Sequence, residues 1–548
     1  MKKEKDILYN MMRSYTVLLS VFKIKGIIIF SFLLIIFLES CVSISKYNSQ
    51  INTIRTVQEL KSDVDFVQYK LEKLHPDLYH YISKNDLNYK FDSLRSSLIS
   101  PMTSNEFYFK LSPVVASIRQ GHTQTYPLTK KFTNSEKKII NRSGTSPLNQ
   151  FEFELFDNRL YIVKNNSKDS TIKSGTEVIS VNGVKPQDIF KIYINTFCSD
   201  GYNNTFIPRR LAKGFARYFF YQNGINDSIY CQISYKDSIR NISLKRFVKP
   251  KKSTITKSKE QLIQDKKLQK IESKKRKLLG YDPLLHRYSK QLSFPVQDSS
   301  IAIMKISDFT KGNYKQFYKQ SFQKMDSLNT KALIIDIRDN TGGSIDDVYN
   351  LFSYLSDSCY RFMDKSEVSS KTSLWHSGFF NHKPLWSYVM HPLSIPVFVL
   401  RNAYTYLRTV KGKDNKYRYP LYYTRLHQPK PQRFKAKVYV LINGGSFSAS
   451  SMLSSNLRGA NRAVFIGVET GGADNGCVAG IMPLRTLPKS KLSIKFGLLV
   501  LQTPYKSKVD GRGIFPDVEI QPTLTDRITN NDPELKWILN DIQGLQQK

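Results

Sequence analysis

The C-terminal half of this chain contains short, almost wholly apolar runs separated by longer segments of helical pattern. Such runs, without polar alternation, are typical of strands buried on both faces, as in a parallel sheet covered by helices. The sequence therefore predicts an α/β core over residues 293–528, followed by a helix over residues 529–548. The runs that carry this prediction are residues 301–306, 332–337, 438–442 and 463–467.

Two of these runs end in turns rich in glycine or serine. Residues 336–343 read Asp-Ile-Arg-Asp-Asn-Thr-Gly-Gly, and Ser344 with Asp347 can cap the helix that follows. Residues 443–452 hold a glycine pair and four serines before another helical segment. A serine at such a turn lies beside the positive end of the helix, where an oxyanion would be stabilised. A tight, capped connection without chemistry is the alternative for each turn.

Upstream of the core the pattern changes twice. Residues 54–130 have helical periodicity and include a Gly-His-Thr sequence around His122, whereas residues 145–248 consist of short alternating runs typical of strands. We predict an N-terminal helical domain and an inserted β-rich domain. Residues 249–292 form a basic helical connector, with fourteen basic and four acidic side chains up to Lys290. A solvated face is our interpretation of that charge, and a phosphate- or lipid-binding arm is the alternative.

The N-terminus indicates export. Residues 27–38 are apolar apart from Ser31 and follow two lysines. A helix of that length spans about 18 Å, short of a hydrocarbon core of about 30 Å, and a basic flank before a short apolar run is typical of a signal peptide. The sequence Leu-Glu-Ser-Cys that ends at Cys41 resembles the lipobox of bacterial lipoproteins. This resemblance implies a signal peptide over residues 1–40, lipidation of Cys41 and a tether over residues 41–53; a non-lipid signal or an uncleaved anchor is the alternative.

Export also decides how the net charge is interpreted. A formal charge of +38 suggests nucleic acid or an anionic membrane surface as a binding partner. An exported chain does not meet nucleic acid, so we expect none as a partner. We expect a cell-envelope protein, lipid-anchored to a bacterial membrane and facing the periplasm, because no acidic run follows Cys41. The spacing of the other cysteines leaves their pairing open, and the oligomeric state is also left open.

Four features, taken in order, resemble the C-terminal processing (tail-specific) serine peptidase family and its tricorn and interphotoreceptor-retinoid-binding-protein relatives. They are the Gly-His-Thr sequence, the turn at residues 336–343, the serine-rich turn with residues 467–472 after it, and Gly-Ile-Phe-Pro-Asp at residues 513–517. The resemblance implies a ClpP/crotonase-like α/β core and a serine endopeptidase acting on peptides or unfolded proteins. Residues 172–183 look like the core of a PDZ domain, which binds extended peptide by strand addition; a purely structural insert is the alternative.

The family's motif assigns the nucleophile to Ser448. The processing peptidases use a downstream lysine base in a Gly-Lys-Gly context, but residues 471–476 of this chain read Gly-Gly-Ala-Asp-Asn-Gly. The tricorn-like branch uses a histidine, which matches His122, and an acid, which matches Asp510. The resemblance thus implies a Ser448–His122–Asp510 arrangement in which His122 takes the serine proton. Glu469 and Asp474 are alternatives for the acid.

The same resemblance implies the surroundings of this triad. The backbone N–H of Gly342 or Gly343, with that of Ala449, would form the oxyanion hole. Arg338 and Asp517 are expected to support the turns. We expect no metal and no organic cofactor, because no cluster of cysteines and histidines suggests one.

Two other functions remain open at the level of sequence. The missing lysine is compatible with a non-catalytic peptide-binding or scaffold lipoprotein on the same fold. Because a fold does not determine a substrate, a hydrolase of other esters or amides is a third candidate.

Overall fold

The computed structural model describes residues 44–247, 259–283, 287–295, 298–378 and 391–546. The predicted signal peptide, the lipidation site Cys41 and the first part of the basic connector lie outside these residues. Among the helices of the described ranges, none is both long and apolar enough to cross a bilayer.

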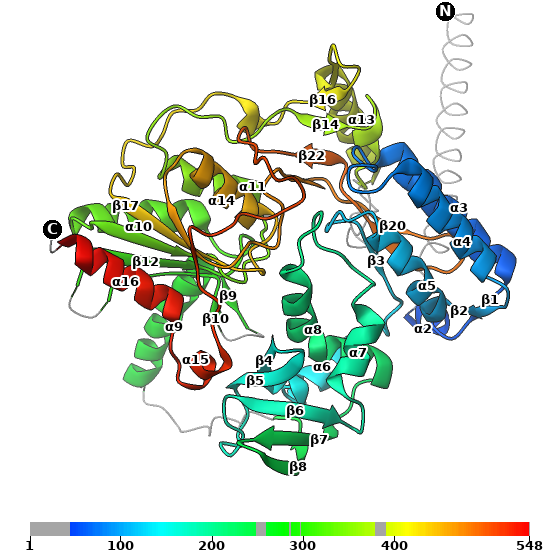
Figure 1. Cartoon of the computed structure of the whole chain (residues 1–548), viewed down its shortest axis with the longest axis horizontal. Helices are drawn as coiled ribbons and strands as arrows, with labels where there is room; N and C mark the ends of the chain where they lie inside the picture. Colours follow the sequence, from blue (N-terminus) through cyan, green and yellow to red (C-terminus); the bar gives the residue numbers. More distant parts are fainter. Residues whose placement is uncertain (1–43, 248–258, 284–286, 296–297, 379–390, 547–548) are drawn as a thin grey trace, which may run out of the picture.

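A six-stranded sheet forms the centre of the C-terminal half (Figure 1). Its order is β11-β12-β13-β17-β18-β23, and every neighbouring pair is parallel except β11 with β12. The predicted α/β core is thereby confirmed. The core begins at Lys290, earlier than predicted, because β11 adds an antiparallel edge before the first apolar run. The strands are β11 (Lys290–Ser293), β12 (Ile301–Ile306), β13 (Ala332–Asp336), β17 (Lys437–Ile442), β18 (Val464–Gly467) and β23 (Val518–Glu519).

The core strands bury side chains on both faces of the sheet. Ile334 and Leu441 pack in one layer with Ile538 of the C-terminal helix α16 (Pro533–Gln546). Their neighbours Leu333 and Val440 point into the opposite layer, as the two-residue period of a strand requires. That second layer contains α10 (Tyr314–Ser327), α11 (Ile345–Ser353) and α14 (Ala449–Gly459). The predicted C-terminal helix is therefore one of the layers that cover the core sheet.

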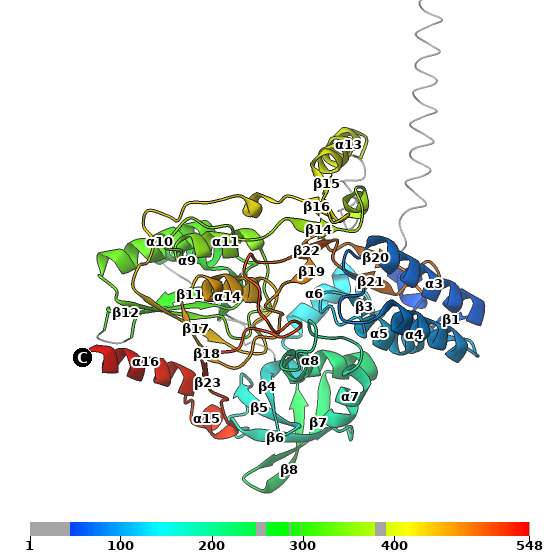
Figure 2. The ribbon, with the colours of Figure 1, turned by 45° about the horizontal axis from the view of Figure 1, so that its top comes forward.

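The inserted region contains a five-stranded antiparallel sheet of order β4-β5-β6-β7-β8, below the core in Figures 1 and 2. Helix α8 lies between this sheet and the core in both views. A β-rich insert is what the alternating pattern predicts; its likeness to a PDZ domain stays a prediction. The elements are β4 (Phe151–Phe156), β5 (Arg159–Asn165), β6 (Thr176–Val181), α7 (Pro186–Tyr193), α8 (Phe206–Asn223), β7 (Ser228–Tyr235) and β8 (Ser238–Lys245).

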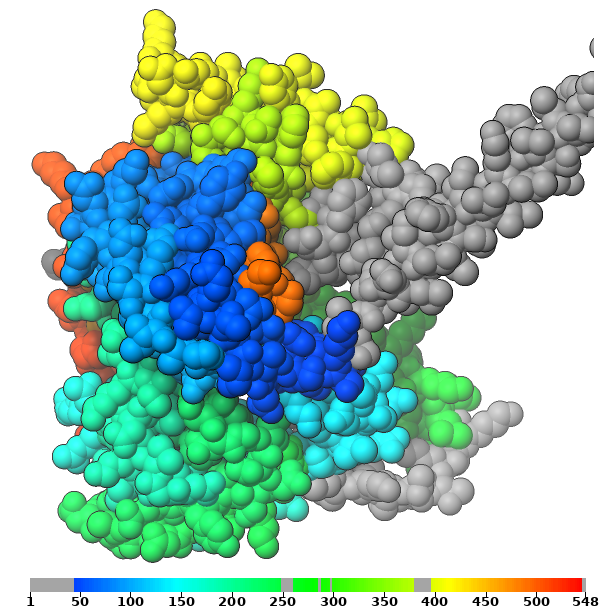
Figure 3. Space-filling view, turned by 90° about the vertical axis from the view of Figure 1, so that its right-hand side faces the viewer, coloured from blue at the N-terminus to red at the C-terminus, as the bar shows by residue number. Residues whose placement is uncertain are grey.

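The N-terminal region is a group of helices on one side of the molecule, as the blue atoms of Figure 3 show. Its helices are α2 (Ile44–Ser49), α3 (Val57–Leu74), α4 (Lys84–Ser97) and α5 (Ser104–Ala116), with the short pair β1 (Ile54–Arg55) and β2 (Met102–Thr103). Thr103 and Glu106 form a capping box at the start of α5. The strand β3 (Gln124–Tyr126) then joins a sheet with β20 (Leu484–Thr486) and β21 (Ser493–Lys495). This pairing fixes the segment around His122 against the C-terminal half.

Short elements connect these parts. The connector helix α9 (Lys259–Leu279) carries the basic side chains, most of which are exposed. The remaining pairs and helices are α6 (Asn134–Arg142), β9 (Tyr281–Asp282), β10 (Arg287–Tyr288), β14 (Ser366–Val368), α13 (His391–Arg408), β15 (Val410–Lys411), β16 (Tyr417–Tyr419), β19 (Cys477–Ala479), β22 (Leu499–Leu501) and α15 (Leu524–Ile528). Among the described residues the cysteines are unpaired; they are Cys198, Cys231, Cys359 and Cys477.

Candidate active site

Ser448 lies in the turn between β17 and α14, directly before the first residue of the helix. Its backbone has φ 57° and ψ −118°, a conformation that residues other than glycine rarely adopt. Strain of this kind costs on the order of 1–3 kcal/mol and persists only where the surrounding structure imposes it. The turn therefore holds Ser448 in an unfavourable conformation at the positive end of α14.

The other serines of this turn have structural contacts. Ser446 Oγ donates to the Ile337 carbonyl at 2.8 Å, and Ser450 Oγ donates to the Asn340 carbonyl at 2.8 Å. Ser451 Oγ donates to the Ser446 carbonyl at 3.3 Å. These three hydroxyls tie the turn to itself and to the neighbouring glycine turn, whereas Ser448 contacts a side chain from another region.

That side chain is His122. Its Nε2 lies 3.0 Å from Ser448 Oγ, and its ring lies against Phe447 with 5.2 Å between centroids. Burial and, to a smaller extent, the positive charge of Lys495 lower the pKa of His122 to about 4. The imidazole is consequently neutral at pH 7, which is the form that can accept a proton. The structure thus brings together two of the three predicted catalytic residues, although they are far apart in sequence.

The glycine turn lies directly beside Ser448. A Cβ added at Gly342, where φ is +96°, would come within 2.8 Å of the Ala449 nitrogen and of Ser448 Cβ. The Gly342 N–H donates to Asn340 Oδ1 at 2.9 Å, so it is already engaged. Within the described residues, the N–H groups of Gly343 and Ala449 have no acceptor. Of the predicted oxyanion-hole donors, these two are free to receive a ligand.

The structure does not bring Asp510 to His122. Asp510 Oδ2 lies 2.7 Å from His80 Nε2, and Asn475 Nδ2 donates to Oδ1 at 3.2 Å. The side chain is half exposed. The triad predicted from the resemblance is therefore not formed with this acid, because the N-terminal helical region supplies another histidine that engages it.

The two alternative acids also have other partners. Glu469 makes a bidentate ion pair with Arg512, at 2.7 and 3.0 Å, and accepts the Gly513 N–H at 2.7 Å. Burial raises the pKa of Asp474, and a hydrogen bond from Ser455 opposes that shift. Both residues hold the loops around the site rather than the imidazole.

The sequence did not single out Asp200 and Cys477, which lie next to His122. A ring nitrogen of His122, a carboxylate oxygen of Asp200 and the Cys477 sulfur lie within 4.8 Å of one another. Residues of these three types can ligate a metal, and no other group of three or more in the described ranges comes as close together. Asp200 precedes α8 in the inserted domain and Cys477 begins β19, so no local motif links either residue to the Gly-His-Thr sequence.

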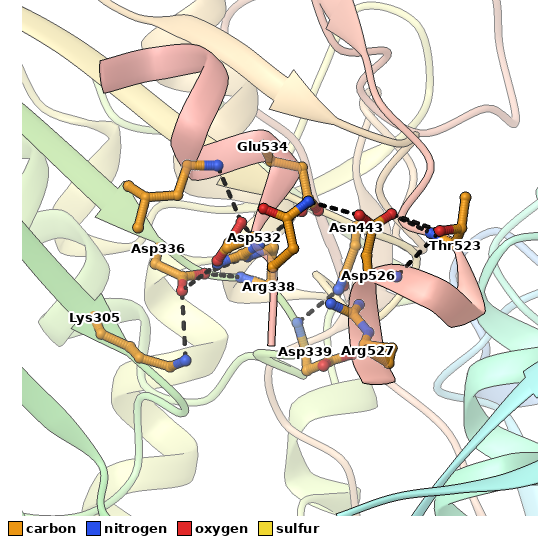
Figure 4. Close-up of polar contacts among 12 residues, drawn as sticks. Lys305, Asp336, Arg338, Asp339, Asn443, Thr523, Asp526, Arg527, Asp532 and Glu534 are labelled. Atoms are coloured by element: carbon orange, nitrogen blue, oxygen red, sulfur yellow. Dashed lines mark hydrogen bonds and ion pairs between the residues drawn. The ribbon is translucent and has the colours of Figure 1, made fainter. Parts of the chain in front are cut away.

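Arg338 lies in a separate cluster of charges, drawn in Figure 4. It contacts Asp336 at the end of β13 at 3.0 Å, and Asp532 and Glu534 at the start of α16 at 2.7 and 3.0 Å. Asp517 accepts the Phe465 N–H at 2.7 Å and so holds the end of the sheet together. These contacts agree with the supporting roles expected of Arg338 and Asp517.

Comparison with known proteins finds matches to the C-terminal half of the chain. Residues 300–520 match the model of peptidase family S41. That segment is similar to the peptidase domain of this family. The carboxy-terminal-processing protease of Bartonella bacilliformis is 32% identical over 112 residues, which cover 20% of this chain and 24% of that protein. The chain therefore matches about a quarter of that relative's length. Both matches support a serine-type peptidase.

Solved structures extend the likeness to most of the chain. Mature CPAF is 16% identical, with a TM-score of 0.54 over 86% of this chain and 94% of that chain. Its complex with lactacystin is 15% identical, with a TM-score of 0.55 over 89% and 98%. At this identity the likeness shows a shared fold. The predicted family resemblance is confirmed, whereas the use of histidine in place of lysine stays a prediction.

Proposed function

We propose that this chain is an exported serine endopeptidase that hydrolyses peptide bonds in peptides or unfolded proteins through an acyl-enzyme. The observation that carries the proposal is the 3.0 Å contact between His122 Nε2 and Ser448 Oγ. A serine hydroxyl is a poor nucleophile at its free pKa and needs an adjacent base. The neutral imidazole of His122 is such a base.

The reaction proceeds in two steps. Ser448 Oγ attacks the substrate carbonyl carbon while His122 Nε2 takes the hydroxyl proton, and that proton passes to the leaving nitrogen as the C–N bond breaks. A water molecule, deprotonated by the same ring nitrogen, then hydrolyses the acyl ester and restores the Ser448 hydroxyl. The N–H groups of Gly343 and Ala449 stabilise the oxyanion in each step; losing one such donor typically costs about 3 kcal/mol.

The choice of a peptide substrate is supported by the S41 match and by the processing protease of B. bacilliformis. In this proposal the inserted five-stranded sheet acts as a PDZ-like domain. Its outermost strands are β4 and β8, and in this proposal an extended peptide adds to one of them as a further strand. Backbone pairing of this kind suits unfolded chains, whose own N–H and C=O groups are not already paired.

The proposed location is the cell envelope, with a lipid on Cys41 facing the periplasm. It rests on the short apolar run and the lipobox-like sequence before Cys41. Metabolic labelling of a bacterium that expresses the chain with a radioactive fatty acid tests it. Label that is present in the wild type and absent from Cys41→Ala supports the anchor, whereas unchanged label in the variant contradicts it.

The activity is tested by incubating the full chain with a reduced and alkylated, permanently unfolded protein and, separately, with a fatty-acid nitrophenyl ester. We expect cleavage of the protein at internal bonds, abolished in Ser448→Ala. Ester turnover without proteolysis would favour a hydrolase of other esters. Saturable binding of the unfolded protein without any cleavage would favour a peptide-binding scaffold.

A further inference from the structure

Two buried polar atoms close to the proposed nucleophile lack partners. Among the described residues, His122 Nδ1 and Asp200 Oδ2 are both buried and neither has a hydrogen-bond partner. The two side chains belong to the group whose ligand atoms lie within 4.8 Å of one another. Because buried polar atoms in folded proteins are nearly always paired, two unpaired atoms on adjacent side chains point to an interaction between these side chains.

Asp200 is held in place from the side of His122. Its Oδ1 accepts the N–H of Gly121, the residue directly before His122, at 2.8 Å. The next residue, Gly201, donates its N–H to the Arg119 carbonyl at 2.8 Å. The loop that carries Asp200 is therefore hydrogen-bonded to the turn that carries His122, and a change in one displaces the other.

The loop that carries Asp200 is also tied to the segment after the serine turn. Ser199 Oγ donates to the Gly471 carbonyl at 2.5 Å, and Asn203 Nδ2 donates to the Thr470 carbonyl at 2.8 Å. On its outer side Tyr202 donates its N–H to the Gly511 carbonyl at 2.7 Å. A side chain at Gly201, where φ is +61°, would overlap the backbone of Gly511. The loop has little freedom to move as a whole, so Asp200 is a rigid part of the site.

We propose that Asp200, supplied by the inserted domain, is the positioning carboxylate of the site, accepting the His122 Nδ1–H through Oδ2. The inference rests on the proposed roles of Ser448 and His122. With the proton held on Nδ1, the lone pair of Nε2 faces Ser448 Oγ, which is the tautomer that a general base requires. The carboxylate also stabilises the imidazolium that forms when His122 takes the serine proton.

Asp510 has a different role in this arrangement. It is fixed by His80 at 2.7 Å, and the residue after it, Gly511, provides the surface on which the Asp200 loop packs. Asp510 therefore holds the loop that covers Asp200, and its effect on His122 is indirect.

Burial gives Asp200 an unusual protonation behaviour. It raises the pKa of this carboxyl to about 7, against the N–H groups of Gly121 and Ala473, which lower it. The ionisable groups that face the pair from neighbouring elements are Tyr81, Cys198, Cys477 and Lys495. Burial raises the pKa of the two thiols and of the tyrosine, so all three are neutral at pH 7, and Lys495 is the cation among them. A protonated Asp200 would donate to Nδ1 and leave the His122 proton on Nε2, which disables the base below about pH 7.

The experiment measures the rate at which a fluorophosphonate inactivates the full chain between pH 5 and 9, with EDTA present to exclude metal ions. Wild type is compared with Asp200→Asn, Asp510→Asn and the matched control Asp63→Asn. Asp63 is a buried carboxylate that, like Asp200, accepts two N–H groups from a distant loop, those of Lys489 and Ser490 at 3.0 and 2.6 Å. Asp63→Asn controls for the general effect of neutralising a buried carboxylate that accepts hydrogen bonds from the backbone of a loop.

We expect Asp200→Asn to slow inactivation by about 10³-fold or more and to remove the rise in rate through pH 7, as loss of a triad carboxylate does. Asp510→Asn should slow it less than tenfold and keep that rise, and Asp63→Asn should leave the rate and its pH profile as in the wild type. Wild-type rates at pH 8 for folded Asp200→Asn would overturn the inference.

Two further results distinguish a failure of the Asp200 assignment from a failure of the proposed function and from a variant that does not fold. A wild type that is not inactivated at any pH contradicts the proposed function itself. If Asp200→Asn does not fold, as judged by its thermal unfolding transition, the half-exposed Asp510 still decides the question. Folded Asp510→Asn that is as inert as His122→Ala would overturn the assignment to Asp200, and a rate within tenfold of wild type would support it.

Discussion

Two polar clusters follow the carboxyl ends of neighbouring strands, β13 and β17, and they differ in how completely their charges are paired. Arg338 lies among three carboxylates, two of them from α16. Around His122 the buried Nδ1 and the buried Asp200 Oδ2 have no hydrogen-bond partner among the described residues, and the two side chains lie close together. Paired charges hold one layer of the fold to another, whereas unpaired buried groups beside a strained serine are what a chemical site needs.

The largest expected effect separates the two clusters by activity. Ser448→Ala should lower the turnover of an unfolded protein substrate by about 10⁴-fold or more, because the residual rate comes from binding and the oxyanion hole alone. Its thermal unfolding should stay close to that of the wild type or rise slightly. Arg338→Ala, assayed below its unfolding temperature, should keep measurable turnover. Loss of turnover in folded Arg338→Ala equal to that in Ser448→Ala would break the distinction.

The second effect distinguishes the Arg338 cluster from the group around His122 by its contribution to the free energy of unfolding. Arg338→Ala should lower the free energy of unfolding by about 3–5 kcal/mol, because it leaves the buried carboxylate Glu534 without its cation and Asp336 with Lys305 alone, at 3.5 Å. Urea unfolding monitored by circular dichroism measures this loss. Arg276→Ala is a suitable control, since it removes an exposed ion pair with Glu272 within α9 and should leave the free energy of unfolding almost unchanged.

The third effect is a pair of opposite pH dependences. Burial raises the pKa of Asp200 to about 7 in the fold, so the stability that its proton gives is complete below about pH 4 and is lost as the pH rises through 7. In Asp532 burial acts in the same direction, but the bonds and charge of Arg338 outweigh it and lower the pKa to about 2. The stability given by this ionised carboxylate is present above about pH 4 and is lost as the pH falls through 2.

Unfolding of the two asparagine variants between pH 2 and 9 checks these signs. Relative to wild type, Asp200→Asn should gain stability from pH 4 to 7, by up to about 4 kcal/mol for a shift of about three pH units. Asp532→Asn should be less stable than the wild type at neutral pH, and this difference in the free energy of unfolding should disappear as the pH falls toward 2. Two parallel profiles would contradict the account of both carboxyls.

The smallest effect concerns His80, which joins Asp77 and Asp510 at 3.0 and 2.7 Å. The hydrogen bond to Asp77 and then the charges of the two carboxylates raise the pKa of His80 to about 9. The stability that protonated His80 gives to the fold is therefore complete below pH 6.5 and is lost as the pH rises through 9. His80→Gln should lower the free energy of unfolding by about 1 kcal/mol at pH 6, an order appropriate to a partly exposed pair. The difference should vanish above pH 9; one that persists there would have another cause.

Local patterns predicted the core well and its limits less well. The apolar run at residues 332–337 reappears as β13 and the last helix as α16, because each is fixed by its own hydrophobic pattern. The edge strand β11 was assigned to the connector, since its residues Lys290–Ser293 are strand-like only through pairing with β12. Such an element depends on tertiary context that periodicity does not contain.

The residues of the candidate site also fall into those that a local motif predicted and those that only the tertiary packing reveals. Ser448 and His122 were predicted because each lies in a local motif of the family. Asp510 was also chosen by motif position, but its side chain engages His80, a contact of residues separated by 430 positions. Asp200 lies in no motif, and only the packing of the inserted domain against the Gly-His-Thr turn brings it to His122. A contact of this kind, made between segments far apart in the chain, leaves no local pattern in the sequence.

The most direct test of the account is to identify the residue that reacts with a fluorophosphonate. The full chain is treated at pH 8, digested, and the adduct is located by mass spectrometry in the wild type and in His122→Ala. We expect one adduct, on Ser448, and a rate of labelling at least 10³-fold lower in His122→Ala. An adduct on Ser446, Ser450 or another residue, or equal labelling of Ser448 without His122, would contradict it.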